Sequence, residues 1–483
     1  MEKRKLRVGF ITCNPLLKTG FSHNARNILP ILYKTGKYEI FLLSQQTKCD
    51  DPHLKRMPWK TYGVFTNVDQ SKMGDPSYQR FVAYGNTAVR DFVIENELDV
   101  CFHIEDIWSS NDDVYLKSDW FKYIRQNFVQ WSTADSEPIL PNFKIWAENC
   151  PNMWFWSSFA EKRLKEENPQ KYGHCKTVYG SINSDNFYPL PEHDRKELRR
   201  KFGIKDDETL ILYLGRNQLR KLFWSHMEAL KKFKEKHPEK KVRLLFHCNW
   251  SEGWPLDRIR EELGLKKEDV LATYFCQSCG DWVVQPFYGE NLKCSVCGKA
   301  TKITAGILST INEKDLNKIY NMADGSCSVF TSGGFEYTHA ESLLAGVLLA
   351  SVNYSCGEDF CSQDFVFEIK PTKNLTRECG TGFKKFVPDI DSIVEFYEYI
   401  ERMDSKLKAS VTSRGREWAM KNFDAKVIAK KIEDFIDSCK LIDWSEYKNK
   451  KKELKNPNAQ IQDTEDDYEF VNQCYKKILN MHD

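Results

Sequence analysis

The sequence predicts an α/β fold in which two doubly wound, Rossmann-like domains face each other across a cleft. At 483 residues the chain exceeds the size of one ordinary core and suits two domains with additions. Short apolar segments, of the kind buried in parallel sheets, alternate with segments of helical spacing. This alternation runs along the chain twice, and repeated β–α units favour parallel sheets covered by helices on both faces.

The first series of elements begins with an apolar strand at residues 7–12. A helix at residues 22–33 follows, because its apolar side chains recur on one face. The same reasoning predicts the remaining elements of this series, which are a helix at 80–96 and strands at 38–43, 99–104, 128–131 and 153–156.

The second series starts after Pro189 and Pro191, where a polar stretch at residues 192–200 predicts a linker. Its predicted strands lie at 209–215, 241–248, 328–331 and 347–352, and its helices at 222–236, 256–263, 313–322 and 339–345. We therefore place the first domain at residues 1–190 and the second at 191–425. Residues 426–483 are helical and charged, and we expect this C-terminal extension to pack back on the first domain.

Composition indicates a folded, water-soluble chain. Hydrophobic residues make up 41% and charged residues 29%, and the net charge of +2 gives no global reason to expect nucleic-acid binding. No segment reaches the roughly 18 apolar residues of a membrane span, and the apolar run at residues 8–11 is too short for a secretory signal. Sixteen cysteines in a long chain of this kind favour a reducing cytoplasm over a disulfide framework.

The most specific local pattern is a pair of CxxCG motifs within residues 273–305. Cys276 and Cys279 form one pair, Cys294 and Cys297 form the other, and fourteen residues separate the two. Four thiolates at this spacing can complete a closed tetrahedral site for one structural Zn²⁺ ion. Two disulfides, or chance spacing of reduced cysteines, are the alternatives, and the cytoplasmic interpretation favours zinc.

Aromatic and basic side chains accompany the predicted zinc ribbon. They could form a docking face for a partner or pack the ribbon against its neighbours, and we favour packing because small zinc modules need aromatic contacts. These residues are Trp282, Phe287, Tyr288, Lys293, Lys299 and Lys302.

Two loops of the second domain carry candidate binding residues. Gly215 ends a predicted strand, and Arg216 and Lys221 follow it before a helix begins. Two cations beside a helix N-terminus suit a diphosphate, although a basic turn that opens a surface helix is also common. The glycine-rich run 331–346 leads into a helix with one acid, Glu341. That carboxylate could accept the hydroxyls of a ribose, or it could stabilise the helix dipole.

In order and spacing these loops resemble the family 4 glycosyltransferases, which have the GT-B fold. The resemblance includes the loop 215–221, the Asp324 segment before a strand, and the run from Gly333 to Gly346. The segment 179–189 is similar to the interdomain segment of that family, and residues 19–22 are similar to its acceptor-side loop. In all, the resemblance covers about residues 5–425.

Three further features are similar to a branch of the family found in phage and other viral genomes. They are the segment 217–221, the zinc ribbon and the Asn-Tyr-Ser triplet at 353–355. This branch would place the protein in a host cytoplasm.

The resemblance implies a role for each half of the chain and for individual residues. Residues 1–190 would bind the acceptor, and residues 191–425 would bind a UDP- or GDP-sugar. Arg216 and Lys221 would hold the donor diphosphate and stabilise its leaving charge, and Glu341 would take the ribose hydroxyls. The implied donor-binding set is Gly20, Gly215, Arg216, Lys221, Gly333, Gly334, Phe335, Glu336 and Glu341.

Four positions leave alternatives open. His103, at the end of a first-domain strand, could donate to a sugar hydroxyl as a catalytic residue or be a satisfied core residue. Asp135, like Thr19, could lie in a loop that contacts acceptor or donor, although an Asp-Ser before proline also makes an ordinary turn. The family usually has a glutamate where this chain has Gly333, and Glu336 could partly replace it from a reshaped loop.

The resemblance implies a hexosyl- or pentosyltransferase that retains anomeric configuration and needs no metal at the reaction centre. The acceptor would be modified phage DNA, a virion protein or a glycan. Gly333 motivates an alternative, a degenerate scaffold that only binds a nucleotide sugar or a nucleic acid. A phosphorylase or epimerase on the same architecture is a further rival, since a fold does not determine its chemistry.

Overall fold

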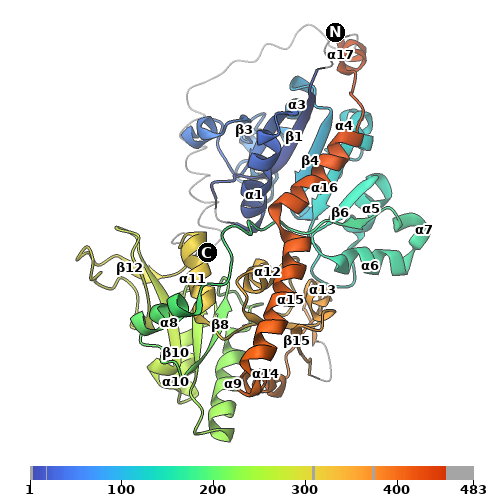
Figure 1. The fold of residues 1–483 in the computed structure, drawn as a ribbon. Coiled ribbons are helices and arrows are strands. Elements are labelled where there is room, and N and C mark those ends of the chain that lie inside the picture. The colour runs from blue at the N-terminus through green and yellow to red at the C-terminus, as the bar shows by residue number, and fades with distance from the viewer. Residues whose placement is uncertain (1–3, 18, 307–310, 373–375, 453–483) are drawn as a thin grey trace.

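Two α/β halves, each built around one sheet, make up the protein (Figure 1). The computed structural model describes residues 4–17, 19–306, 311–372 and 376–452. In the described chain the first sheet has seven parallel strands in the order β3-β2-β1-β4-β5-β6-β7. Their bounds are β1 (Leu6–Cys13), β2 (Tyr38–Gln45), β3 (Lys60–Gly63), β4 (Val100–Ile104), β5 (Phe128–Ser132), β6 (Asn152–Phe155) and β7 (Lys176–Thr177).

Helices cover both faces of this sheet. One face packs against α1 (Gly20–Lys34) and α16 (Ala425–Ser438), which share a buried cluster with Phe10 and Phe102. The other face packs against helices that include α3 (Val89–Glu95) and α5 (Pro141–Asn149). The remaining helices of this half are α2 (Pro76–Ala83), α4 (Asp119–Ile124), α6 (Ser158–Glu167) and α7 (Pro169–Tyr172).

The second sheet combines a parallel core with two antiparallel additions. Its strands run in the order β11-β10-β9-β8-β13-β14-β15, and β12 also pairs with β10. Both β11 and β12 are antiparallel to β10, whereas the other pairs are parallel. The bounds are β8 (Thr209–Leu214), β9 (Val242–His247), β10 (Val270–Cys276), β11 (Trp282–Pro286), β12 (Lys302–Thr304), β13 (Gly325–Ser328), β14 (Leu348–Val352) and β15 (Val366–Ile369).

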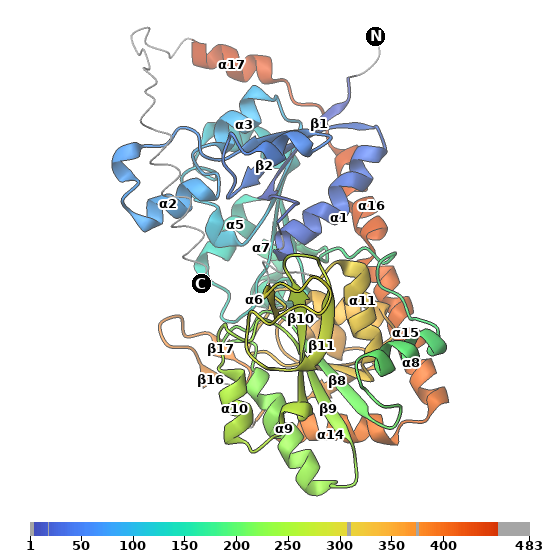
Figure 2. The same cartoon turned by 90° about the vertical axis from the view of Figure 1, so that its left-hand side faces the viewer.

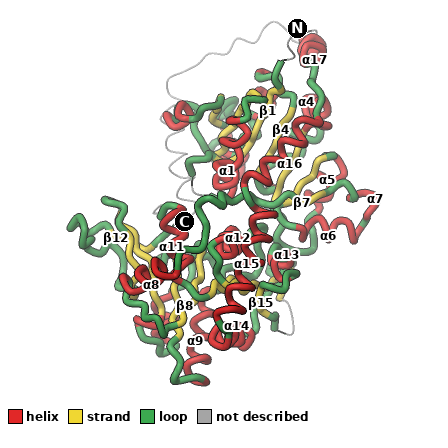
Figure 3. The backbone as a smooth tube through the Cα atoms, viewed as in Figure 1, coloured by secondary structure: helices red, strands yellow, loops and turns green. Residues whose placement is uncertain are grey.

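Helices also surround the second sheet, as the red and yellow segments of Figure 3 show. They are α8 (Glu192–Lys201), α9 (Phe223–Lys236), α10 (Leu256–Glu262), α11 (Glu313–Met322), α12 (Tyr337–Leu344), α13 (Gly357–Cys361), α14 (Ile390–Arg402) and α15 (Ser405–Phe423). A small hairpin of β16 (Thr376–Arg377) and β17 (Lys384–Lys385) projects beside them (Figure 2).

The two parallel cores share one strand order. In the first half β1 lies between β2 and β4, and in the second half β8 lies between β9 and β13. In each sheet, successive strands are added first on one side of this central strand and then on its other side. Such switch points open a crevice at the carboxyl ends of the strands, where ligands of doubly wound sheets bind.

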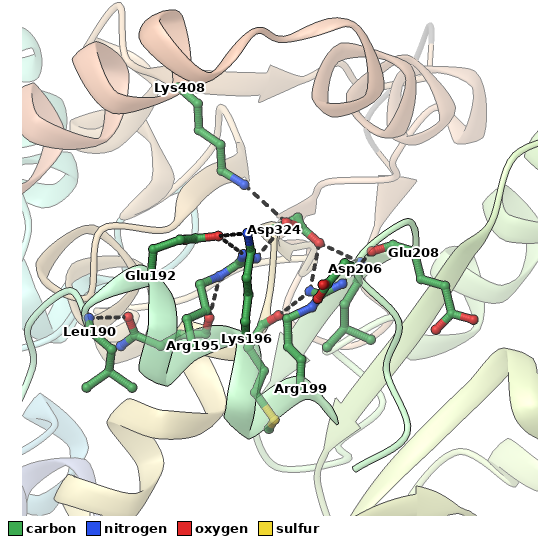
Figure 4. A network of polar contacts seen from close by, with 12 residues as sticks. Leu190, Glu192, Arg195, Lys196, Arg199, Asp206, Glu208, Asp324 and Lys408 are labelled. Carbon is green, nitrogen blue, oxygen red and sulfur yellow. Dashed lines mark hydrogen bonds and ion pairs between the residues drawn. The ribbon is translucent and has the colours of Figure 1, made fainter. Parts of the chain in front are cut away.

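The predicted linker at residues 192–200 is wrong, because these residues form α8. Acidic residues in the first turn and basic residues in the last turn favour the helix through its dipole. Arg195 and Arg199 of α8 reach the carboxylate of Asp324 at 2.7 and 3.0 Å (Figure 4). Lys408 of α15 approaches the same carboxylate at 3.1 Å, and the Leu210 backbone N–H donates to it at 3.0 Å. Asp324 therefore joins α8, β8 and α15 to the start of β13.

Two further predicted elements differ from the structure. The predicted helix 80–96 is two helices, α2 and α3, because the chain turns at Gly85, whose φ of +82° favours glycine. The predicted strand at 328–331 lies earlier, as β13, and the loop that follows it begins at Val329.

The C-terminal helices return to the first half. The long α15 runs along the second half, and α16 continues from it onto the first sheet (Figure 1). In α17 (Trp444–Lys452), the Trp444 indole N–H donates to the Leu98 carbonyl at 2.8 Å. Residues 453–483 of the predicted extension lie outside the described residues. Within the part of the chain that the structure covers, no helix has both the length and the apolar character to span a membrane.

Asp324→Asn is expected to lower the free energy of unfolding by about 3 kcal/mol, because it removes the mostly buried carboxylate that three cations share. Burial alone would raise the pKa of Asp324, but Lys408, Arg199 and Arg195 outweigh it and lower the pKa to about 2. A lowered pKa stabilises the fold above the ordinary value of 3.8, and this stabilisation disappears as pH falls toward 2. Urea unfolding at several pH values should therefore show the full difference at neutral pH and a shrinking one below about 3.8.

Asp206→Asn is the matched control, because half-exposed Asp206 contacts Arg200 at 3.5 Å near the same network. Its effect should stay within about 0.5 kcal/mol. Equal effects of the two substitutions would contradict the structural role of Asp324.

Candidate functional site

Two adjoining hollows lie between the carboxyl edges of the two sheets. The Glu341 hollow, of about 280 Å³, is lined by Thr19, Gly20, His23, Arg26, Leu214, Gly215, Arg216, His247, Asn249, Glu252, Ala305, Gly306, Ile311, Glu313, Leu316, Tyr337, Thr338 and Glu341. The Trp108 hollow, of about 460 Å³, is lined by Gly20, Phe21, Asp106, Ile107, Trp108, Thr133, Ala134, Asp135, Ser136, Leu140, Asn142, Phe143, Trp156, Arg220, Gly334, Phe335, Tyr337 and Phe383. Gly20 and Tyr337 line both hollows. Residues from both halves of the chain therefore meet at one place.

The N-terminus of α1 forms one wall that the two hollows share. Thr19 caps this helix by accepting the Ser22 backbone N–H at 3.2 Å. A side chain at Gly20 would approach the Tyr337 ring at 3.4 Å, and the Tyr337 hydroxyl donates to the Gly20 carbonyl at 2.9 Å. The positive end of a helix dipole, with no acid in the first turn, attracts anions. The predicted placement of Thr19 and Gly20 at the cleft agrees with this geometry.

Polar contacts to Glu313 join the halves beside the Glu341 hollow. His23 and Arg26 of α1 reach Glu313 Oε1 at 3.1 and 3.4 Å, and Asn186 donates to Glu313 Oε2 at 2.6 Å. Burial would raise the pKa of Glu313, but His23, Asn186 and Arg26 lower it to about 2. The carboxylate is therefore charged at neutral pH and holds α1 against α11.

The loop after β8 places Arg216 in the Glu341 hollow. The Arg216 Nε donates to Glu252 Oε2 at 3.1 Å, so a carboxylate orients the guanidinium. Buried Asn217 fixes the two loops to each other, because its amide donates to the backbone carbonyls of Glu252 and, at 2.9 Å, Trp254. Gly215 and Arg216 thus line the Glu341 hollow, and their binding of a diphosphate stays a prediction.

Glu341 lies on α12 with its side chain buried at the wall of the hollow that bears its name. The Tyr320 hydroxyl donates to Glu341 Oε2 at 2.7 Å and so orients the carboxylate. Burial raises the pKa of Glu341. A buried carboxylate at a cavity wall is suited to accept hydrogen bonds from ligand hydroxyls.

Lys221 does not line either hollow in this structure, contrary to the expectation of direct diphosphate contact. Its buried ammonium pairs with the carboxylate of Glu336. Glu336 fills the space beside Gly333, because a Cβ there would lie 2.5 Å from Glu336 Oε1. Glu336 and Lys221 thus form a buried ion pair behind the site, and the neighbouring Arg220 lines the Trp108 hollow instead.

Electrostatics explain this arrangement. Burial lowers the pKa of Lys221, and Glu336 opposes that effect. Burial would raise the pKa of Glu336, but Lys221 and Arg220 outweigh it and the pKa is lowered. Each charge therefore favours the ionised form of its partner at a largely buried position.

His103 is a core residue rather than a residue of the cleft. Its side chain is fully buried and has three polar partners. Nε2 lies 3.2 Å from Gln45 Nε2, and Nδ1 lies 2.7 Å from Ser110 Oγ and 3.0 Å from Gln130 Oε1. Burial lowers the pKa of His103 to about 4, so the ring is neutral at physiological pH. Of the two alternatives, the structure favours the satisfied core residue, because the buried side chain has polar partners and lines neither hollow.

The strand that carries His103 instead delivers Asp106 and Trp108 to the Trp108 hollow. Asp106 accepts a hydrogen bond from Thr133 Oγ1 and another, at 3.3 Å, from the Trp108 indole N–H. Burial and then the nearby Asp135 raise the pKa of Asp106. Neither Asp106 nor Trp108 was predicted from the sequence. A signal was nevertheless present, because the two acids Glu105 and Asp106 directly follow a buried strand, and such positions lie at the carboxyl edge of a parallel sheet.

The remaining predicted residues line the Trp108 hollow. Asp135 lies there and contacts Ser332 Oγ through Oδ2 at 3.4 Å, so it joins the two halves. Phe335 packs edge-on against Trp156 of the first half and against Tyr337. Gly334 abuts Thr133 so closely that any side chain at Gly334 would clash. The loop 333–336 therefore belongs to the interface of the two halves.

The four predicted metal ligands come together at the end of β10. The sulfur atoms of Cys276, Cys279, Cys294 and Cys297 all lie within 4.8 Å of one another. Backbone N–H groups of Gly280 and Gly298 each donate to the first cysteine carbonyl of their pair at 2.9 Å, and both glycines have positive φ. Four converging sulfurs without another donor form a closed site that suits Zn²⁺ and leaves no position for chemistry.

The aromatic residues of the ribbon mainly pack against the second half. Trp282 packs on Phe202 at 5.1 Å, and Phe287 stacks on Trp250 at 4.7 Å. The more exposed Tyr288 lies under the Lys267 ammonium. These contacts favour the packing alternative for Trp282 and Phe287.

The ribbon also touches the Glu341 hollow. Its return strand β12 leads directly to Ala305 and Gly306, which line that hollow. Glu290 of the ribbon accepts the Thr304 backbone N–H at 2.6 Å and the Ser251 hydroxyl at 3.2 Å. The loop that carries Ser251 also carries Glu252, the partner of Arg216. The ribbon therefore supports the loop that orients Arg216.

Comparisons with known proteins identify the fold. No protein-family model matches the chain, and no curated protein matches it. Among solved structures, a glycosyltransferase from Rickettsia africae superposes with a TM-score of 0.61 at 14% identity, over 90% of this chain and 98% of that one. Anabaena Alr3699/HepE, solved with UDP and glucose, gives 0.57 at 11% identity, over 90% and 100%. Sucrose-phosphate synthase from Thermosynechococcus elongatus gives 0.59 at 13% identity, over 89% and 98%.

These likenesses extend over both halves and almost the whole length of the known chains. Together with the two doubly wound sheets, they confirm the predicted GT-B fold. At identities this low they are evidence of the fold and not of the reaction.

Cys294→Ser is expected to reduce bound zinc from about one ion per chain to a small fraction, because it removes one of four ligands. Elemental analysis of the purified protein measures this content. Cys379→Ser, at an exposed cysteine outside the cluster, is the control and should keep the metal. Full zinc content in Cys294→Ser would contradict the site.

Proposed function

We propose that the protein is a glycosyltransferase that moves a sugar from a nucleotide diphosphate sugar to an acceptor hydroxyl. One observation carries the proposal. The Glu341 hollow combines a helix N-terminus, a guanidinium and a buried carboxylate, contributed by both sheet edges. These groups match the diphosphate and the ribose of one ligand.

The donor would lie across both hollows. Glu341 would accept the ribose hydroxyls, and Arg216 with the N-terminus of α1 would bind the diphosphate. The transferred sugar would then reach the Trp108 hollow past Gly20 and Tyr337, which line both cavities. The complex of Anabaena Alr3699/HepE with UDP and glucose is a precedent for such a ligand on this fold.

The reaction we propose retains the anomeric configuration. The bond between the anomeric carbon and the donor phosphate oxygen breaks, and the acceptor oxygen forms a new bond on the same face of the sugar. The acceptor proton passes to the departing phosphate oxygen, so charge and protons balance. Arg216 and Arg220 would stabilise the negative charge that grows on the diphosphate, because preorganised cations act strongly in a site shielded from water.

Glu336 and Lys221 would support this site from behind. Their ion pair holds the loop 333–336, which carries Gly334 and Phe335 into the Trp108 hollow. Glu336 would thereby replace the missing carboxylate at Gly333 in shaping the sugar site. This arrangement argues against the degenerate-scaffold alternative, because the departure at Gly333 has a compensating residue beside it.

The four-cysteine ribbon would hold one structural Zn²⁺ ion, as in the viral branch that the sequence resembles. When bound, the metal supplies folding energy to the ribbon. Glu290 of the ribbon contacts Ser251 in the loop 249–254, and Glu252 of the same loop orients Arg216.

Removing the metal with a strong chelator should therefore weaken nucleotide binding as well, because the ribbon would no longer hold that loop in place.

Arg216→Ala is expected to lower donor turnover about 100-fold, because it removes the oriented diphosphate ligand. Release of nucleotide diphosphate from a panel of UDP-, GDP- and ADP-sugars measures this effect. Arg258→Ala, at an exposed arginine on α10 that pairs with Glu262, is the control and should leave turnover unchanged.

Near-full turnover in Arg216→Ala would refute the phosphate assignment. If no donor reacts but free nucleotides raise the melting temperature, the result favours a protein that binds without catalysis. The absence of both signals would refute the proposed nucleotide site.

A further inference from the structure

Trp108 is a large aromatic side chain that is fixed in place yet half exposed. It lies in the short 3₁₀ turn Ile107–Ser109, and 50% of its surface is accessible. Its indole N–H donates to Asp106, the Tyr84 ring packs edge-on against it at 4.7 Å, and the Arg80 guanidinium lies 5.7 Å from its ring. A side chain held by three neighbours loses little further freedom when a ligand covers it.

Trp108 separates two cavities of ligand size. On one side is the Trp108 hollow, and on the other is the Arg80 hollow, of about 360 Å³. Ile107, Trp108 and Asn142 line both of them. The Arg80 hollow is lined entirely by the first half, by Ser77, Arg80, Phe81, Tyr84, Asn86, Ile107, Trp108, Ser109, Ser110, Asn111, Asp112 and Asn142. A ligand that occupies both hollows would therefore cross the boundary formed by these three residues, of which Trp108 is the exposed one.

The polar groups along this path favour a neutral, hydroxyl-rich ligand. The Trp108 hollow is lined by the acids Asp106 and Asp135 and by Arg220, and the Arg80 hollow by Asp112 and Arg80, so the two signs of charge nearly balance. Side-chain amides accompany them: Asn86 and Asn111 line the Arg80 hollow, and Asn142 lines both. Sites for nucleic acid instead concentrate Lys and Arg against the phosphates. Amides and carboxylates beside an aromatic face suit sugar rings, whose hydroxyls need partners and whose C–H faces are apolar.

We propose that the two hollows on either side of Trp108 form one acceptor groove, which binds a neutral oligosaccharide of at least two sugar units. The unit that receives the transferred sugar lies in the Trp108 hollow, where Asp106 accepts a hydrogen bond from the reacting hydroxyl. The next unit crosses the indole face of Trp108 and enters the Arg80 hollow. This inference rests on the proposed function, because it names the class of acceptor for the same site.

The proposed acceptor groove lies apart from the proposed nucleotide site. The Arg80 hollow has no lining residue in common with the Glu341 hollow, and Trp108 does not line the Glu341 hollow. A substitution at Trp108 should therefore change acceptor binding and leave nucleotide binding unchanged. Because the side chain is half exposed, its removal should also leave the fold intact.

The test measures direct binding of the wild-type protein, Trp108→Ala and Trp108→Phe to a glycan array that carries neutral and acidic oligosaccharides, monosaccharides and duplex DNA. We expect wild type to bind neutral glycans of two or more units. Trp108→Ala should weaken this binding about tenfold, and Trp108→Phe should restore most of it. Tyr288→Ala, at an exposed aromatic residue of the ribbon, is the control and should bind like wild type.

The proposal is overturned if no neutral glycan binds, if binding is confined to DNA or acidic glycans, or if Trp108→Ala binds as tightly as wild type. Calorimetric titration of each variant with UDP and GDP separates this result from the proposed function. Nucleotide binding without Trp108-dependent glycan binding refutes the groove alone. Glycan binding that depends on Trp108 in a protein that binds no nucleotide refutes the transferase alone.

Discussion

The pairing of parallel strands is the constraint on which the candidate site depends. In each sheet the carboxyl ends of the strands lie at one edge, so loops distant in sequence meet there. Gly20 follows β1, Asp106 follows β4, Asp135 follows β5 and Arg216 follows β8. Because the two sheets present these edges to each other, both hollows are built from the loops at those edges together with the ends of helices such as α1 and α12. The sheets position the loops and helices that carry the polar groups.

Ion pairs of three carboxylates, Asp324, Glu313 and Glu336, connect elements that are distant in sequence. Asp324 neutralises the cations that join α8 and α15 to the second sheet, and Glu313 joins α1 to α11. Glu336 likewise forms an ion pair with Lys221, beside Gly333. Each carboxylate has its pKa lowered, in spite of burial, by neighbouring hydrogen-bond donors and charged groups. A buried ion pair needs both members, so these contacts specify the arrangement of loops more than they add net stability.

The ribbon is an insertion that remains continuous with the core. It extends β10 with two antiparallel strands and then returns to the wall of the Glu341 hollow at Ala305. A small module of this size cannot bury enough apolar surface by itself, and its stacking of Phe287 on Trp250 shares the core of the second half. Through the contact of Glu290 with Ser251, the four-cysteine ribbon therefore reaches the loop that orients Arg216.

The sequence by itself determined the fold class, the order of most strands and helices along the chain, and the cysteine cluster, because these depend on local periodicity and short spacing. It also indicated Gly20, Arg216 and Glu341 as residues of one cleft, through motifs that keep their order along the chain. Only the tertiary structure decided where side chains point. His103 faces the core while Asp106, three residues later, faces the hollow, and Lys221 turns to Glu336 while Arg220 lines the cleft. The side chains of neighbouring loop residues point in different directions because each contacts partners that are distant in sequence. A local sequence pattern does not identify those partners.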